Sequence, residues 1–151
     1  MNRIESEKKI KNLVHSLRYE KGHVCAIDVL LGMDYLSKKE VELWRFGKVN
    51  YLEQVCNGSL GKLSFVNKCI RKHASELKLE ASWTSYNQYG KGAKRRLRFS
   101  KSGEKNIEDA YATHYIDKKR ILEIKQAKAE NNHKNEQVGS INDINNNTLL
   151  Q

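Results

Sequence analysis

The sequence predicts an α+β protein that is mostly helical, with one basic β-hairpin at about residues 82–101 and a C-terminal helix after it. Three observations support this fold class. Apolar residues recur at helical spacing up to about residue 80, β-branched and aromatic residues then dominate "SWTSYNQY" and "RRLRFS", and helical spacing returns after residue 102. Residues 3–125 are therefore expected to form one domain, and the Asn-rich residues 126–151 a disordered tail.

Short helices with clear start and stop signals are expected in the first sixty residues. The first helix ends at Lys21 and Gly22, a common stop signal, and a second is expected from about residue 26 to 33. Two further helices begin at capping-box pairs, which are Ser37 with Glu40 and Asn50 with Glu53. The apolar face of the first helix consists of Ile10, Leu13, Val14 and Leu17.

The segment 59–79 is the clearest amphipathic helix of the chain. Ser59 is its expected N-cap. Its cationic side chains fall on the far side of the apolar stripe, so one face docks on the core and a basic face points outward. The stripe consists of Leu60, Leu63, Val66, Ile70, Ala74 and Leu77, and the basic face includes Lys68, Arg71 and Lys72.

The positive charge of the chain is concentrated in its middle. The formal net charge is +10, and residues 61–101 hold 11 basic and 2 acidic side chains. Residues 81–103 contain no acid at all. Because like charges repel one another, such a concentration indicates a polyanionic partner. The cations of the predicted hairpin are Lys91, Lys94, Arg95, Arg96, Arg98 and Lys101.

A helical cluster, a basic amphipathic helix and a basic hairpin follow one another in the order found in winged-helix proteins. The resemblance is one of architecture over residues 3–101. It implies that the helix enters a DNA groove while the hairpin, or wing, contacts the neighbouring backbone. We therefore expect a non-enzymatic nucleic-acid-binding protein that prefers DNA and clamps phosphates without a cofactor. The expected contacts are Lys68, Arg71, Lys72, Tyr86, Tyr89, Lys91, Lys94, Arg95, Arg96, Arg98 and Lys101.

The aromatic residues of this region are expected to divide into two groups. Tyr86 and Tyr89 lie nearest the hairpin tip, so they are the candidates for stacking on unpaired bases. The others have the size and context of core residues, although Trp83 could also reach a base. This second group consists of Trp44, Phe46, Trp83, Leu97 and Phe99.

Two other classes of function remain open. The basic hairpin of a protein-interaction module would dock on an acidic partner, whereas an enzyme acting on nucleic acid could use His114 with Tyr111 and Tyr115.

A metal site at Cys69 and His73 lacks the paired ligands usual for zinc, so buried, inert cysteines are the better interpretation. Three widely spaced cysteines and the absence of a long apolar segment predict a reduced, cytoplasmic protein without a membrane span.

Overall fold

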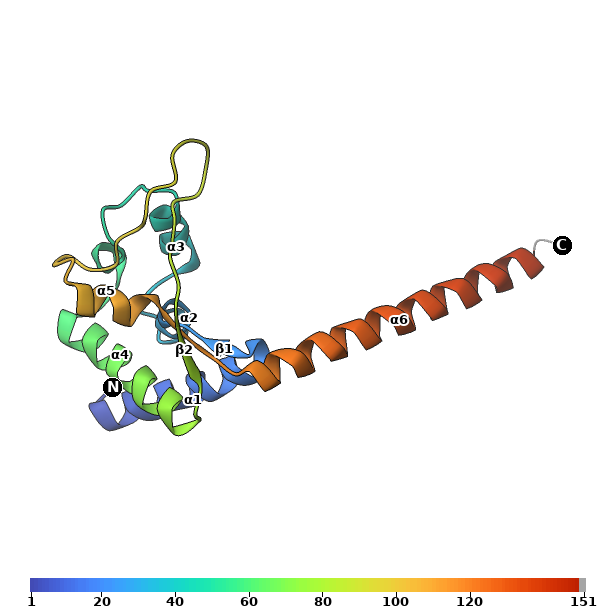
Figure 1. Ribbon diagram of the computed structural model, residues 1–151, viewed down its shortest axis with the longest axis horizontal. Helices are drawn as coiled ribbons and strands as arrows, with labels where there is room; N and C mark the ends of the chain where they lie inside the picture. The colour runs from blue at the N-terminus through green and yellow to red at the C-terminus, as the bar shows by residue number, and fades with distance from the viewer. Residues whose placement is uncertain (150–151) are drawn as a thin grey trace.

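The structure, a computed structural model, describes the backbone of residues 1–149 and the side chains of residues 1–135. It is mostly helical with a small antiparallel sheet, which confirms the α+β class. Figure 1 shows a rounded body from which the last helix projects. In chain order the elements are α1 (Arg3–Lys21), β1 (His23–Val24), α2 (Ala26–Gly32), α3 (Lys38–Arg45), the 3-10 turn η1 (Leu52–Val55), α4 (Leu60–Glu76), β2 (Glu80–Trp83), α5 (Lys105–Ala112), β3 (Thr113–Ile116) and α6 (Lys118–Leu149).

The three strands form an antiparallel sheet in the order β1-β3-β2. The central strand β3 is the last of the three in the chain. It pairs on one side with β1, where Val24 lies opposite Tyr115, and on the other with β2, where Trp83 lies opposite Thr113. The sheet therefore closes only after the chain has passed through a long loop and α5.

The predicted helices of the N-terminal part are confirmed, with one exception. Ser37 and Glu40 form the expected capping box of α3, and α1 ends at Gly22, whose φ of 78° lies in the left-handed region favoured by glycine. Ile10 and Val14 are fully buried on α1. Asn50 does not cap a helix, because the short turn η1 begins at Leu52, and the Asn50 N–H donates to the side-chain oxygen of Gln54.

Helix α4 also follows its sequence pattern. Ser59 accepts a hydrogen bond from the backbone N–H of Lys62, and the stripe from Leu63 to Ala74 is buried against the other helices. Leu60 departs from the stripe, since 61% of its surface is exposed at the first turn. The outer face of α4 is therefore polar except at its N-terminal end, where Leu60 is exposed.

The predicted hairpin is present only in part, because its two legs pair over a much shorter stretch than expected. Residues 84–104, which we term the basic loop, pair antiparallel at Asn87 and Arg96, where the N–H of Gln88 donates to the Arg95 carbonyl and the N–H of Leu97 to the Tyr86 carbonyl, both at 2.7 Å. The pairing stops after Leu97, because the next two carbonyls of "RRLRFS" bind η1. The N–H groups of Leu52 and Glu53 donate to the carbonyls of Arg98 and Phe99, at 3.1 and 2.9 Å.

The single helix expected after residue 102 is divided in two by a strand. Helix α5 ends where the Thr113 hydroxyl donates to the Asp109 carbonyl at 2.7 Å, and Thr113–Ile116 then forms β3. The spacing of apolar residues suits a helix here, but a strand bonded on both sides satisfies more backbone groups. Tertiary pairing overrides the local pattern.

Helix α6 continues through most of the segment expected to be disordered. Residues 126–149 are helical in the structure, while residues 150 and 151 lie outside the described part. Lys, Ala, Glu and Gln dominate residues 123–130, and these residue types have high helix propensity. No helix within residues 1–149 combines the length and the hydrophobicity that crossing a membrane requires.

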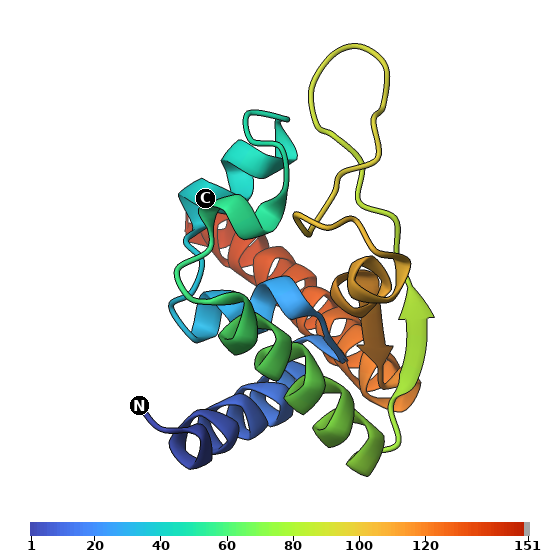
Figure 2. The same ribbon diagram turned by 90° about the vertical axis from the view of Figure 1, so that its left-hand side faces the viewer.

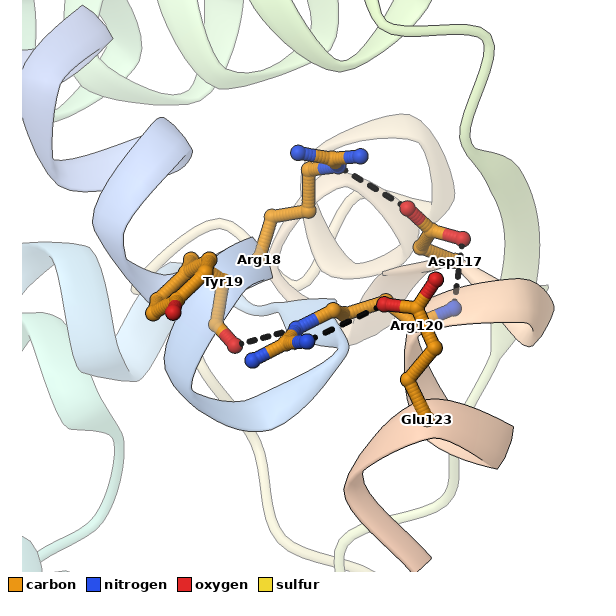
Figure 3. A network of polar contacts seen from close by, with 5 residues as sticks. All are labelled: Arg18, Tyr19, Asp117, Arg120 and Glu123. Atoms are coloured by element: carbon orange, nitrogen blue, oxygen red, sulfur yellow. Dashed lines mark hydrogen bonds and ion pairs between the residues drawn. The ribbon is translucent and has the colours of Figure 1, made fainter. Parts of the chain in front are cut away.

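A polar network fastens the start of α6 to the end of α1 (Figure 3). Asp117 accepts the backbone N–H of Arg120 at 3.0 Å and the Nε–H of Arg18 at 2.9 Å. Arg120 donates from Nε to the Tyr19 carbonyl at 2.7 Å and from Nη1 to Glu123 at 3.0 Å. Asp117 is thus both the cap of α6 and its link to α1.

Replacing Asp117 tests how much this network contributes to folding. Asp117→Ala removes a helix cap and an ion pair, so we expect a loss of about 1–2 kcal/mol in the free energy of unfolding. Asp117→Asn keeps an oxygen that can accept the Arg120 N–H and should lose clearly less. Thermal unfolding of both variants measures the difference, and equal losses would show that the cap has no separate contribution.

Candidate nucleic-acid interface

All three cations predicted on α4 are exposed, but only two of them are without an acidic partner among the described side chains. Lys68 and Arg71 are exposed and line a groove between α4 and α5. Lys72 instead faces α1, where its Nζ lies 2.7 Å from the Glu7 carboxylate. The hydrogen bond from Lys72, together with its charge, lowers the pKa of Glu7. Lys72 therefore joins two helices, while its side chain remains 58% exposed.

The α4 groove has a volume of about 860 Å³ and combines charged walls with an apolar floor. Lys68 and Arg71 come from α4, and Lys101 enters from the basic loop. Leu60 and Ile107 contribute exposed apolar surface. Helix α5 forms the opposite side of the groove and lies between α4 and the projecting loop in both views of the molecule (Figures 1 and 2).

The first leg of the basic loop is held by Arg45 at the end of α3. The Arg45 guanidinium lies over the rings of Tyr86 and Tyr89, with its carbon 4.6 and 4.4 Å from their centroids. Its Nη1 donates to the Asn87 carbonyl at 3.2 Å, and its own carbonyl accepts the Tyr89 N–H at 2.7 Å. Arg45 was not among the sequence candidates, because nothing in "LWRFG" indicates contact with a loop forty residues later.

The second leg is held by a buried tryptophan and two carboxylates. Trp44 is fully buried and its Nε1–H donates to the Arg98 carbonyl at 2.8 Å. Glu108 accepts the N–H groups of Phe99 and Ser100 at 2.9 and 2.7 Å. Glu53 accepts the Lys101 N–H at 2.9 Å. The basic loop is consequently fixed at both ends.

The cations at the tip of the loop, residues 90–95, are left free by this arrangement. Lys91, Lys94 and Arg95 are exposed, and their side chains make no hydrogen bond or ion pair with the side chains that the structure describes or with its backbone. Gly90 and Gly92, with φ of 105° and 109°, provide the reversal of the chain at the tip. The tip therefore presents three cations to solvent from a rigid base.

Two of the predicted arginines already have contacts within the chain. Arg96 lies over the indole of Trp83, 4.7 Å from the ring centroid. Arg98 folds back on its own loop, where Nε donates to the Ser100 carbonyl at 2.7 Å and Nη2 to the Lys101 carbonyl. Both remain exposed, so their charge still adds to the positive surface.

The expected roles of several aromatic residues change in the structure. Tyr86 is buried, with its hydroxyl 2.5 Å from Nε2 of His114, so its ring is not accessible to a base. Burial also raises the pKa of the Tyr86 hydroxyl. Tyr89 is half-exposed but lies against Phe46 and Arg45. Trp44 and Phe99 are core residues as predicted, whereas Phe46 and Trp83 are not, since 42% and 49% of their surfaces are exposed.

The three residues of the enzyme alternative do not converge. Because β3 is a strand, His114 and Tyr115 point to opposite faces of the sheet. Tyr111 is buried and donates its hydroxyl proton to Glu53 at 2.7 Å. His114 stacks on His23, and its burial lowers its pKa, as does the neighbouring charge of His23.

The cysteines have the environment of inert thiols. Burial raises the pKa of Cys25 and of Cys56 to about 12, and Cys69 is buried as well. His73 hydrogen-bonds to Glu76 at 3.1 Å on the same helix. The part of the chain that the structure describes has no cluster of three side chains suited to a metal ion.

Three acids around the groove and the loop are engaged within the chain, whereas the cations there are exposed. Glu53 and Glu108 are held by backbone N–H groups, and Asp109 accepts the Trp83 Nε1–H at 3.0 Å. The exposed cations of the groove, the basic loop and the start of α5 have no acidic partner among the described side chains; they are Lys68, Arg71, Lys91, Lys94, Arg95, Arg96, Arg98, Lys101 and Lys105. Lys105 is the one member of this set that was not predicted from the sequence.

Comparison of the chain with protein-family models, with curated proteins and with solved structures finds no match.

Proposed function

We propose that this protein binds nucleic acid without acting on it chemically, with a preference for DNA. The observation that carries the proposal is the set of unpaired cations on α4, the basic loop and the start of α5. Lys72, by contrast, has an acidic partner in Glu7. Unpaired cations that lie near one another repel one another, and a polyanion removes that repulsion.

Phosphate groups are the polyanion that this surface suits best. Lys and Arg neutralise phosphates and release condensed counterions, which supplies affinity with little dependence on sequence. Lys68 and Arg71 on α4 would contact one stretch of backbone, while Lys91, Lys94 and Arg95 at the tip would contact another. Arg98 is a less suitable phosphate contact than these residues, because its guanidinium already donates two hydrogen bonds to backbone carbonyls.

The preference for DNA rests on a proposed winged-helix architecture. The sheet order β1-β3-β2, with α4 directly before β2 and a long basic connection before β3, supports it. In such an arrangement α4 would enter the major groove and the basic loop would act as the wing. Helix α3, η1 and α5 would be additions to the minimal fold. A-form RNA has a major groove too narrow for a helix, so duplex RNA should bind less well.

A second candidate is a protein partner with an acidic, partly apolar segment. The exposed Leu60 and Ile107 in the α4 groove favour it, because phosphate contacts need no apolar floor. An acidic helix could place apolar side chains on this floor and carboxylates near Lys68 and Arg71. Such a partner would leave the three cations of the loop tip unused.

The proposed function is tested by comparing two neighbouring cations of α4. Affinity for duplex DNA is measured over a salt series with Arg71→Ala and Lys72→Ala. Arg71→Ala should reduce the slope of log K against log salt by about 1, because one phosphate contact is lost. Lys72→Ala should leave the slope unchanged, since Lys72 faces Glu7. Absence of binding at low salt, or equal effects of the two substitutions, would contradict the proposal.

A further inference from the structure

Trp83 is a large aromatic residue in an unusual position. It ends β2, where Ala81 and Trp83 share one face of the strand and Ser82 points to the other. The indole is 49% exposed, although burying it would stabilise the fold. Its orientation is nevertheless defined, since its Nε1–H donates to Asp109 at 3.0 Å. An exposed indole with a defined orientation can stack on a ligand.

The indole lies in an open hollow of about 730 Å³, which we term the Trp83 hollow. This volume falls within the range of about 300–1,000 Å³ typical of small-molecule sites. Arg96, Arg98 and Lys105 contribute its positive charge. The hollow also has two carboxylates, and both accept hydrogen bonds within the chain. Glu108 accepts the N–H groups of Phe99 and Ser100, and Asp109 accepts the indole N–H of Trp83.

The Trp83 hollow adjoins the α4 groove. Asp109 lines both, and α5 contributes residues to each of them. Ala81 lines the groove two residues before Trp83, on the same face of β2. A strand of nucleic acid held by Lys68, Arg71 and Lys101 would therefore pass next to the indole.

We propose that the Trp83 hollow binds an unpaired nucleobase, which stacks on the indole while Arg96 and Lys105 contact the adjoining phosphates. This inference rests on the proposed function and narrows its target to nucleic acid with single-stranded or extruded bases. Every base has a π-face, so stacking on tryptophan accepts any sequence. The planar guanidinium of Arg96, which lies over the indole, can stack on the arriving base and also bind phosphate.

Trp83 is better suited to this role than either tyrosine of the loop. Tyr86 is buried, and Tyr89 lies against Phe46 and under the Arg45 guanidinium, which also holds the loop. Displacing Arg45 from Tyr89 would release the first leg of the loop. Arg96 makes no hydrogen bond with the described residues, so it can move with an arriving base without breaking one.

The two tryptophans of the chain allow a direct optical test. Trp44 is fully buried and Trp83 is half-exposed, so acrylamide should quench mainly the fluorescence of Trp83. A short single-stranded oligonucleotide should protect this signal, and an abasic oligonucleotide with the same phosphates should not. Trp83→Phe leaves only Trp44 and should abolish the quenchable signal.

Affinity measurements with the same probes supply a second, independent test. The intact single strand should bind about tenfold more tightly than the abasic strand, the effect of one stacked base. Trp83→Leu should remove this difference, and Trp83→Phe should retain part of it. Tyr19→Leu is the matched control, since Tyr19 is also an exposed aromatic under an arginine, 4.1 Å from Arg120, but it lies on α1. It should leave the difference intact.

The outcomes separate this inference from the proposed function. If both strands bind equally and acrylamide still quenches Trp83, no base stacks there and the inference is overturned, while phosphate binding stands. If neither strand nor a duplex binds at low salt, both fail. Two results together support the inference. The intact strand, but not the abasic strand, protects Trp83 from acrylamide, and Trp83→Leu removes the difference in affinity between the two strands.

Discussion

Removing the three cations at the loop tip is expected to weaken nucleic-acid binding about a hundredfold at about 0.1 M salt. The variant is Lys91→Ala, Lys94→Ala and Arg95→Ala combined. Each cation that contacts a phosphate contributes about 0.9 to the slope of log K against log salt for duplex DNA, so the slope should fall by up to about 3. The midpoint of thermal unfolding should stay within about 1–2 °C of wild type, since these side chains have no partner among the residues that the structure describes.

The matched control removes the same charge from another surface. Lys8, Lys9 and Lys11 lie on α1 and can be replaced by alanine together, which gives the same net charge. If long-range attraction alone governs binding, both triple variants weaken it equally. A clearly larger effect at the tip identifies the basic loop as the contact surface, and equal effects contradict that assignment.

Replacing Trp44 with alanine is expected to cost about 3–5 kcal/mol in the free energy of unfolding. The side chain is fully buried, its ring packs against Tyr86 and Phe99, and its Nε1–H donates to the Arg98 carbonyl. The cavity and the unpaired carbonyl both destabilise the folded state. For a chain of this length the midpoint of thermal unfolding should fall by roughly 10 °C.

Trp44→Phe separates packing from hydrogen bonding. The phenyl ring fills most of the cavity but cannot donate to the Arg98 carbonyl, so a loss of about 1–2 kcal/mol is expected. Calorimetry of the two variants measures both quantities. A loss in Trp44→Phe as large as in Trp44→Ala would show that the hydrogen bond, rather than the packed ring, holds the second leg of the loop.

The helices could be predicted because their signals are local. The capping box of Ser37 and Glu40 and the glycine stop at Gly22 involve residues within one turn of each other. The buried stripe of α4 likewise follows from spacing alone. Burial of Phe99 and exposure of the loop-tip lysines were predicted for the same reason, since hydrophobicity and charge are properties of single residues.

The errors occur where distant segments compete for backbone hydrogen bonds. "RRLRFS" has the alternation of a strand, yet η1 takes the carbonyls of Arg98 and Phe99. Thr113–Ile116 has helical spacing, yet β1 and β2 bond it from both sides. Neither partner can be identified from the local pattern, because the pairing depends on the path of the chain between them.

The sequence by itself determined the α+β class, the helical N-terminal part and the concentration of positive charge in residues 61–101. Only the tertiary structure decided which cations are free. Lys72 meets Glu7 because α1 crosses α4, whereas Arg71, one residue away, faces the open groove. Trp83 is exposed because β2 turns it away from the core. Charge and hydrophobicity belong to each residue, but partnership and exposure depend on which surfaces the folded chain brings together.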